Sequence, residues 1–207
     1  MIENDTRNKN IGIFGGTFDP IHFGHLNLAI QMLEGQNLDE IWFCPAQLSP
    51  HKLDAQPVSS SHRLRMLEIA IDGFDSFKIL DRELKRPPPS YTIDTIEDLL
   101  NDEKLKNNHY SLILSDDAVE RFHQWHRVKD LVELVPLLLG SRHGQNSLGE
   151  TNEGTLSQAI QSGLKKTLIM EISSTLLRDR LKKNLYCLHL LPHKVLDYIY
   201  ENHLYST

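Results

Sequence analysis

Two histidines follow a pair of glycines at a spacing that could bind a phosphate group. Segment 15–25 has the sequence GGTFDPIHFGH and lies between a short apolar run and an expected helix. Gly15 and Gly16 allow main-chain N–H groups to approach an anion without a Cβ in the way. His22 and His25 share one face of the first helical turn, where each ring can donate a hydrogen bond to a phosphate oxygen. We interpret this segment as a candidate phosphate-binding loop.

The same segment fits two other interpretations. It could be a tight turn at the start of a helix, in which both histidines have only a structural role. It fits a zinc site less well, because no third Cys, Asp or Glu stands nearby at a clear ligand spacing. The patterns GxGxxG and GxxxxGK(S/T) are both absent, so it is neither a dinucleotide-binding loop nor a P-loop.

A second junction between a strand and a helix carries hydroxyl groups and an arginine. Residues 172–178 have the sequence ISSTLLR. Ser174 and Thr175 are typical N-cap residues, and Arg178 is expected about one turn into the helix on the same side. Hydroxyl groups, N–H groups of the first turn and a guanidinium group together could bind phosphate. The alternative is an ordinary capped helix with an arginine at the surface.

The hydrophobic pattern predicts alternating strands and helices around these two junctions. Strands are expected at 11–14, 40–44, 77–80, 110–114, 131–139 and 167–170, although Pro136 is unfavourable in a central strand. Helices are expected around 26–35, 59–71, 93–100, 174–183 and 192–202, the second with an apolar face of Leu64, Leu67 and Ile71. The alternation predicts an α/β fold, a Rossmann-like doubly wound parallel sheet of about five to six strands with helices on both faces. Ligands of such sheets bind beyond the carboxyl ends of the strands.

The chain of 207 residues predicts one domain. We expect a flexible N-terminal tail over residues 1–9 and a single domain over residues 10–207, on which the helices from about residue 174 pack. Residues 143–163 are rich in Gly, Asn and Ser and poor in apolar side chains, so we expect a mobile connection there.

Composition and charge exclude several classes of function. Lys and Arg total 22 against 28 Asp and Glu, and a net charge of −6 is unfavourable for binding along a nucleic-acid backbone. The longest apolar runs are far shorter than the roughly 20 residues of a membrane-spanning helix, and the polar N-terminus does not look like a secretory signal. Cys44 and Cys187 are far apart and form no CxxC motif, which is typical of reduced thiols in a cytoplasm.

The segment GGTFDPIHFGH resembles the signature of the nucleotidylyltransferase superfamily, whose core is (T/S)xxH or HxGH, and most closely the version found in bacterial nicotinate-nucleotide adenylyltransferases. The segment ISSTLLR resembles the ISSTxxR motif of the same superfamily, which holds the β- and γ-phosphates of ATP. The resemblance extends over residues 11–202.

Three further segments resemble this family. Residues 45–52 are similar to the loop after the second strand, which implies that Lys52 contacts phosphate, unless it is an ordinary solvated lysine. Tyr91 and Thr92 belong to a segment similar to SYTxDT, which implies that Thr92 lies beside the nicotinate ring, with a helix N-cap as the alternative. Trp125 and His126 belong to a segment similar to one whose Trp stacks on the pyridine ring, with a core Trp as the alternative.

The chain departs from the family pattern after its fourth expected strand. Where the family usually has Gly-Ala/Thr-Asp, this chain has Ser115, Asp116 and Asp117. Asp117 aligns with the family Asp near the adenosine ribose, but Ser115 places a side chain where glycine permits a close approach. Residues 142–144 are Arg-His-Gly, where the family tends to have Arg-Pro-Gly.

The implied reaction transfers the adenylyl group of ATP to nicotinate mononucleotide, giving nicotinate adenine dinucleotide and pyrophosphate in NAD biosynthesis. The resemblance implies catalytic roles for His22, His25 and Arg178. It assigns to ATP the residues Gly15, Gly16, Thr17, Phe18, Lys52, Asp117, Ser173, Ser174 and Thr175. It assigns to the mononucleotide the residues Tyr91, Thr92, Trp125 and His126. Mg²⁺ is the implied cofactor, carried by ATP with most of its water ligands.

Several alternatives stay open at this point. The acceptor could be nicotinamide mononucleotide or another phosphate, although phosphopantetheine adenylyltransferases are shorter and lack the Trp125 segment, and cytidylyltransferases usually carry a different C-terminal motif. The protein could instead be a non-catalytic nucleotide sensor with this fold. We expect ATP and nicotinate mononucleotide as partners, no nucleic acid, no membrane and a cytoplasmic location; the sequence leaves monomer and homo-oligomer open.

Overall fold

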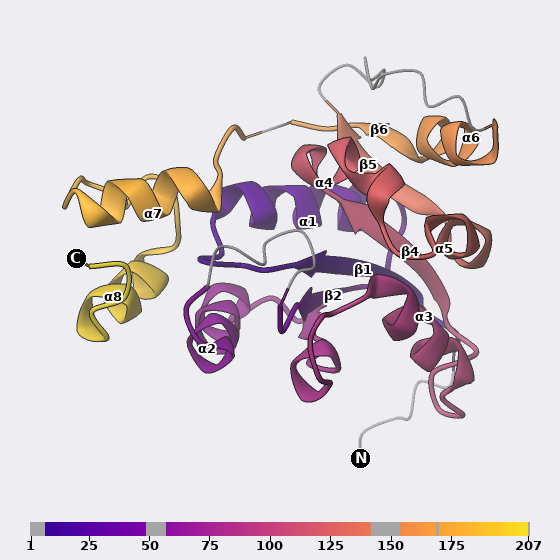
Figure 1. Ribbon diagram of the computed structural model, residues 1–207, viewed down its shortest axis with the longest axis horizontal. Coiled ribbons are helices and arrows are strands. Elements are labelled where there is room, and N and C mark those ends of the chain that lie inside the picture. Colours follow the sequence, from indigo (N-terminus) through magenta and orange to yellow (C-terminus); the bar gives the residue numbers. More distant parts are fainter. Residues whose placement is uncertain (1–6, 49–56, 142–153, 169, 207) are drawn as a thin grey trace.

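One parallel sheet of six strands organises the chain (Figure 1). The computed structural model describes residues 7–48, 57–141, 154–168 and 170–206, without the side chains of 116, 117 and 141. The strands are β1 (Asn10–Gly16), β2 (Glu40–Pro45), β3 (Phe77–Ile79), β4 (His109–Leu114), β5 (Leu137–Ser141) and β6 (Leu164–Lys166). Their order is β3-β2-β1-β4-β5-β6, and every neighbouring pair is parallel. The expected Rossmann-like fold is confirmed.

Helices cover both faces of the sheet. The α-helices are α1 (Phe23–Gly35), α2 (Ser60–Ile71), α3 (Thr92–Asn101), α4 (Asp116–Glu120), α5 (Val128–Leu134), α6 (Gly154–Gly163), α7 (Ser174–Lys182) and α8 (His193–Glu201). Two short 3₁₀ helices are η1 (Glu83–Lys85) and η2 (Phe122–Gln124). In Figure 1, α7 and α8 lie together at the left end, whereas β6 and α6 lie at the upper right.

Two hydrophobic cores follow from this layering. On one face, buried side chains of α1, α2, α7 and α8 pack against Phe14 and Phe43. On the other, buried side chains of α3, α5 and α6 pack against Ile13 and Leu112. Adjacent residues such as Ile13 and Phe14 enter opposite cores because strand side chains alternate between the two faces. The central parts of β1, β2 and β4 are therefore mostly apolar, as expected for a parallel sheet buried on both sides.

The strand order reverses between β1 and β4. From β1 the chain moves to β2 and β3 on one side, whereas β4 leads to β5 and β6 on the other. The connections that leave the carboxyl ends of β1 and β4 therefore run to opposite sides and open a crevice between them.

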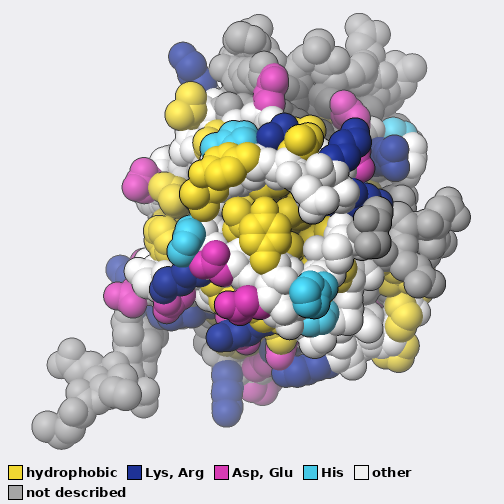
Figure 2. All heavy atoms as spheres, turned by 90° about the vertical axis from the view of Figure 1, so that its left-hand side faces the viewer, with side chains coloured by type: hydrophobic (Ala, Val, Ile, Leu, Met, Phe, Trp, Pro, Cys, Tyr) yellow, Lys and Arg dark blue, Asp and Glu magenta, His cyan; other side chains and the backbone are white. Residues whose placement is uncertain are grey.

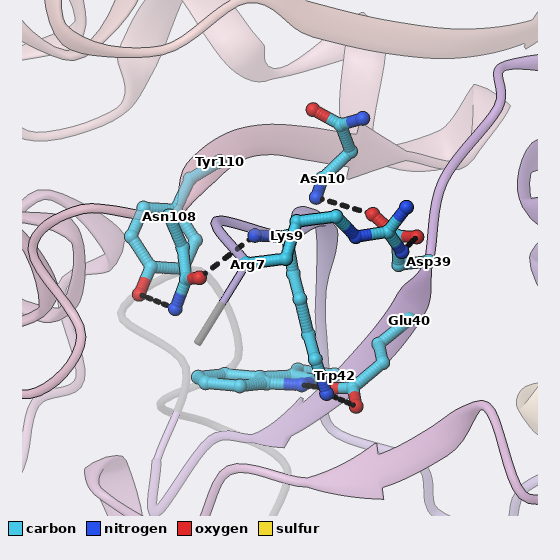
Figure 3. A network of polar contacts seen from close by, with 8 residues as sticks. All are labelled: Arg7, Lys9, Asn10, Asp39, Glu40, Trp42, Asn108 and Tyr110. Atoms are coloured by element: carbon cyan, nitrogen blue, oxygen red, sulfur yellow. Dashed lines mark hydrogen bonds and ion pairs between the residues drawn. The ribbon is translucent and has the colours of Figure 1, made fainter. Parts of the chain in front are cut away.

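A polar network fixes the opposite, amino-terminal end of the central strands (Figure 3). The main-chain N–H of Asn10 donates to Asp39 (2.8 Å). Glu40 accepts from Lys9 Nζ at 2.8 Å and from Trp42 Nε1 at 2.7 Å. Burial acts to raise the pKa of Glu40, but these two donors outweigh it and leave that pKa lowered. The network anchors the starts of β1 and β2 at the end away from the crevice.

The structure corrects three sequence-based expectations. Residues 131–134 belong to α5 rather than to a strand, and β5 begins only after Pro136, whose carbonyl accepts from the N–H of Leu112 (2.9 Å). Proline has no N–H, so it fits before the strand and not within it. The last strand is β6 at 164–166, not 167–170. Residues 154–163 form α6, held by the buried Leu156 and Ile160.

Parts of two expectations fall outside the described residues. These are positions 1–6 of the expected tail and positions 143–153 of the expected connection, which include the His-Gly of the departure at 142–144. In the part of the chain that the structure describes, no helix has the length and apolar character needed to cross a bilayer.

Candidate active site

A cavity of about 780 Å³ opens at the carboxyl ends of the strands. This volume lies within the range of small-molecule sites. Its lining includes fourteen of the residues predicted from the sequence: Gly15, Gly16, Thr17, Phe18, His22, His25, Tyr91, Thr92, Trp125, His126, Ser173, Ser174, Thr175 and Arg178. Lys52 and the side chain of Asp117 lie outside the described residues. Residues as far apart in the sequence as Gly15 and Arg178 thus meet around one space.

The two glycines after β1 differ in their surroundings. A Cβ added to Gly16 would lie 2.9 Å from the ring of Phe18, which folds back over this position. Phe18 itself has a left-handed backbone (φ 50°), uncommon for a bulky residue, and its side chain is buried. At Gly15, which lines the cavity, an added Cβ would have no described atom within 4 Å. Gly16 is therefore required by the fold, whereas Gly15 leaves room beside the cavity.

His22 and His25 form a stacked pair at the start of α1. Their ring centroids are 3.7 Å apart and the planes are 24° from parallel. His22 is the N-cap residue, and its Nδ1 accepts from the main-chain N–H of His25 (3.4 Å). In the neutral ring Nε2 therefore carries the proton and can donate it to a ligand. His25 meets Phe14 and Phe18 edge to face, with ring centroids 6.0 and 5.1 Å away. Packing thus fixes both rings at the cavity.

The start of α7 contacts the loop after β1 directly. The N-cap residue is Ser173, whose hydroxyl accepts from the N–H of Leu176 (3.1 Å), so the expectation that Ser174 or Thr175 caps this helix is wrong. The Ser174 hydroxyl instead donates to the carbonyl of Pro20 (3.0 Å). The Ser174 hydroxyl thus joins two segments that are 154 positions apart in the sequence.

Arg178 is held at the same contact. Its Nη1 donates to the carbonyl of Asp19 (2.7 Å) and lies 3.7 Å from Asp19 Oδ2. Its Nη2 donates to Thr175 Oγ1 (3.2 Å). A guanidinium group has five N–H donors, so these bonds orient Arg178 and leave others to bind an anion. Asp19 was not singled out from the sequence, although it is the only acidic residue of segment 15–25.

A second arginine lies beneath the cavity. Arg63 on α2 is only 1% exposed, and burial lowers the pKa of its guanidinium group although Asp19 acts in the opposite direction. Its donors reach four main-chain carbonyls: Val58 (3.1 Å), Thr17 (2.8 Å), Ala46 (2.7 Å) and Gln47 (3.2 Å). Arg63 therefore joins the loops after β1 and β2 to the start of α2.

Arg63 also explains why the predicted apolar face of α2 was wrong in part. Leu67 and Ile71 are buried as expected, but Leu64 is only half-buried, and Arg63 and Met66 occupy the interior instead. The sequence does contain a signal for this: Arg63 stands four positions before Leu67 and therefore lies on the same, buried face of the helix.

Aromatic side chains line another part of the cavity. Trp125 is half-buried and meets Phe122 edge to face, with ring centroids 5.1 Å apart. The rings of Tyr91 and His126 are 4.5 Å apart. Thr92 is the first residue of α3 and Tyr91 occupies the N-cap position, so the alternative that Thr92 is the N-cap is wrong. These rings offer flat apolar surfaces for a heterocycle.

Glu83 brings a buried carboxyl group to the cavity lining. It accepts from Thr95 Oγ1 (3.0 Å), which in turn accepts from Arg86 Nη2 (2.9 Å). Burial is the main effect and raises the pKa of Glu83, although the hydrogen bonds and Arg86 oppose it. No sequence pattern points to this residue, because its position depends on the turn η1.

Ser115 occupies the position where the family usually has glycine. Its backbone is extended (φ −82°, ψ 162°), a conformation that any residue adopts, and it lines the cavity. The substitution of Ser for Gly therefore causes no backbone strain here, and what it changes is the space beside the cavity.

Comparison with known proteins gives concordant results. The model of the cytidylyltransferase-like family matches residues 13–180. The nicotinate-nucleotide adenylyltransferase of Bacillus subtilis is 38% identical over 96% of this chain and 100% of its own. A Bacillus licheniformis protein named "Probable nicotinate-nucleotide adenylyltransferase" is 40% identical over the same shares. The solved structure of Plasmodium falciparum nicotinic acid mononucleotide adenylyltransferase complexed with NaAD is similar at a TM-score of 0.69 and 21% identity, over 96% of this chain and 98% of that one.

Replacement of Arg63 tests the role of the buried guanidinium group. We expect Arg63→Met to lower the free energy of unfolding by about 3 kcal/mol or more, because one buried and three partly buried carbonyls lose a donor and each unsatisfied group costs ~1–3 kcal/mol. Urea unfolding would measure this loss. The control is Arg65→Met on the exposed side of the same helix, expected to change stability by no more than about 0.5 kcal/mol. Equal effects of the two variants would contradict the assignment.

The raised pKa of Glu83 predicts a specific dependence of stability on pH. Between the ordinary value of 4.5 and the higher folded value, the folded state holds a proton that the unfolded state has lost, so stability falls as pH rises through this interval. The stability of Glu83→Gln relative to the wild type should therefore increase from pH 4.5 toward neutrality. Glu40→Gln should instead lose stability relative to the wild type as pH rises toward 4.5 and show no further change above it, because the pKa of Glu40 is lowered from 4.5. Denaturation series across pH would measure both, and parallel trends would refute this account.

Proposed function

This chain belongs to the cytidylyltransferase-like family, and we propose on that basis that it is a nicotinate-nucleotide adenylyltransferase. It transfers the adenylyl group of ATP to nicotinate mononucleotide, giving nicotinate adenine dinucleotide and pyrophosphate in NAD biosynthesis. The observation that carries the proposal is one cavity in which a stacked histidine pair and Arg178 lie together with the aromatic groups around Trp125.

The reaction requires positioning more than acid–base chemistry. A phosphate monoester has a second pKa near ~6, so the acceptor phosphate is already mostly dianionic at pH 7. One of its oxygens forms a bond to the α-phosphorus of ATP, and the bond from that phosphorus to the bridging oxygen breaks. Pyrophosphate leaves with the bonding electrons. The protein must hold two anions in line and stabilise the charge that moves to the leaving group.

His22 and His25 are assigned to the α-phosphate. Both rings are held by packing and by the helix start, so their donors are oriented before the substrate binds. Two positive charges at the observed ring separation would repel each other strongly. A phosphate that accepts from both rings would offset that repulsion. Gly15, Gly16, Thr17 and Phe18 contribute the neighbouring main chain.

Arg178 and the start of α7 are assigned to the β- and γ-phosphates. The first turn of a helix presents main-chain N–H groups toward an anion, and α7 begins with Ser174 and Thr175 after the cap at Ser173. Arg178 adds a full positive charge on the same side. Lys52 and Asp117 complete the ATP site in this proposal, on the strength of the family resemblance alone.

Tyr91, Thr92, Trp125 and His126 are assigned to the nicotinate end. Stacking of a pyridine ring on Trp125 would contribute about 0.5–1.5 kcal/mol beyond the burial of apolar area. The Thr92 hydroxyl and the N–H groups at the start of α3 can donate to a carboxylate, which favours nicotinate over nicotinamide.

Mg²⁺ is expected to enter with ATP and to neutralise charge on its phosphates. Among the described residues, no group of three His, Cys, Asp or Glu side chains is arranged to hold a metal ion. Mg²⁺ usually takes its ligands mainly from phosphate oxygens and water. We place the enzyme in the cytoplasm, where thiols stay reduced. Cys44 and Cys187 are both free thiols, and they are buried in separate cores.

Pyrophosphate release by the purified protein tests the proposal. With Mg·ATP, we expect kcat/KM for nicotinate mononucleotide to exceed that for nicotinamide mononucleotide by a large factor. Turnover with nicotinamide mononucleotide alone would retain the reaction and overturn the substrate. Nucleotide binding without turnover of either acceptor would instead favour a nucleotide sensor or another acceptor.

Replacement of His25 tests the histidine pair. We expect His25→Ala to lower kcat by roughly 10²–10³-fold, because a preorganised donor to the transition state is lost. The matched control is His193→Ala, which removes an exposed imidazole on α8 and should leave turnover unchanged. If His25→Ala turns over at the wild-type rate in the same assay, His25 has no part in the chemistry.

A further inference from the structure

The turn after α8 returns to the phosphate-binding loop. The hydroxyl of Tyr205 donates to Asp19 Oδ1 at 2.6 Å, although the two residues are 186 positions apart in the sequence. Asp19 lines the cavity and is only 6% exposed, so its carboxyl group depends on protein partners rather than on water. Nothing in the proposed chemistry uses this bond.

Asp19 links Tyr205 to Arg178. Tyr205 occupies Oδ1, while Oδ2 lies 3.7 Å from Arg178 Nη1 and the main-chain carbonyl of Asp19 accepts from the same nitrogen at 2.7 Å. Tyr205 therefore determines which carboxylate oxygen remains for the arginine. Outer partners of this kind orient the groups that touch a ligand.

We propose that Tyr205 is a positioning residue for the phosphate site: through Asp19 it holds the guanidinium group of Arg178 in place for the leaving pyrophosphate. The proposal rests on the adenylyl-transfer function for the identity of the ligand. It assigns a function to the C-terminal turn that the sequence motifs of the chain do not suggest.

The backbone of the C-terminal turn supports this role. His203 and Tyr205 have left-handed backbones (φ 51° and 61°), which bulky residues seldom adopt. Such conformations persist only where the surroundings determine them. Here the N–H of Leu204 donates to the carbonyl of Ile199 (3.0 Å), and the side chains of Leu204 and Tyr205 pack against the core between α1, α2, α7 and α8.

The end of the molecule that bears α7 and α8 shows hydrophobic side chains at its centre, surrounded by charged groups and histidines (Figure 2).

Burial and the neighbouring carboxylate keep the hydroxyl of Tyr205 a donor. Burial is the main cause and the Asp19 carboxylate the second cause that raise the pKa of Tyr205 far above its usual value, although Arg178 and Arg63 act in the opposite direction. Tyr205 therefore stays protonated at any working pH. Without this donor, Asp19 Oδ1 would be left unsatisfied, and the guanidinium group of Arg178, 3.7 Å from Oδ2, could turn toward it.

Tyr205→Phe tests the proposal with pyrophosphate itself as the probe. By calorimetry, we expect the affinity for pyrophosphate to fall by about tenfold or more. In steady-state kinetics the KM for ATP should rise, while the KM for nicotinate mononucleotide should stay near the wild-type value. The control is Tyr200→Phe, which alters an exposed tyrosine of α8 and should change neither quantity.

A double-mutant cycle with Asp19→Asn separates positioning from a merely structural effect. If Tyr205 acts through Asp19, Tyr205→Phe should weaken pyrophosphate binding much less in the Asp19→Asn background than in the wild type. Equal losses in both backgrounds, an affinity like that of Tyr200→Phe, or a parallel rise of both KM values with a lower melting temperature would each overturn the proposal. Because pyrophosphate binding requires no turnover, these outcomes are distinct from failure of the proposed reaction.

Discussion

The contact between the start of α7 and the loop after β1 is the interaction on which the site depends. Two main-chain carbonyls, those of Asp19 and Pro20, accept from Arg178 and Ser174. These bonds join the two junctions that could each bind phosphate, so that their donors face one cavity. The acceptors are main-chain atoms, so the contact depends on the path of the loop more than on the side chains within it. Buried Arg63 fixes that path from below through the carbonyl of Thr17.

The topology of the sheet explains why such a contact is available. Reversal of the strand order between β1 and β4 leaves a crevice, and the chain brings α7 back to it after forming β6 at the edge of the sheet. A reaction between two phosphate-bearing substrates needs such a site more than it needs an activated nucleophile. The scaffold positions donors, and the substrates supply the reacting groups.

Much of the fold and site could be predicted from the sequence, because the relevant signals are local. Apolar runs, glycine pairs and helix caps specify β1, α1 and α7 from adjacent residues. The errors have physical causes. Pro136 lies between α5 and β5, and the continuous apolar run over 131–139 hides the boundary between these two elements. The helix α6 was missed because it has few apolar residues. Arg63 and Tyr205 escaped notice because their partners are 46 and 186 positions away, a separation that only the folded chain reveals.

Gly15 and Gly16 are neighbours in the sequence, yet different requirements constrain the two positions. The ring of Phe18 covers Gly16, so a side chain there competes with the protein's own packing, whereas Gly15 adjoins open space. One position is constrained by folding and the other only by the molecule that enters the cavity. A side chain at position 15 therefore meets no packing obstacle, and its effect falls on the cavity rather than on the folded core. The same change at position 16 falls on the core itself, so two adjacent glycines separate the demands of folding from those of the cavity.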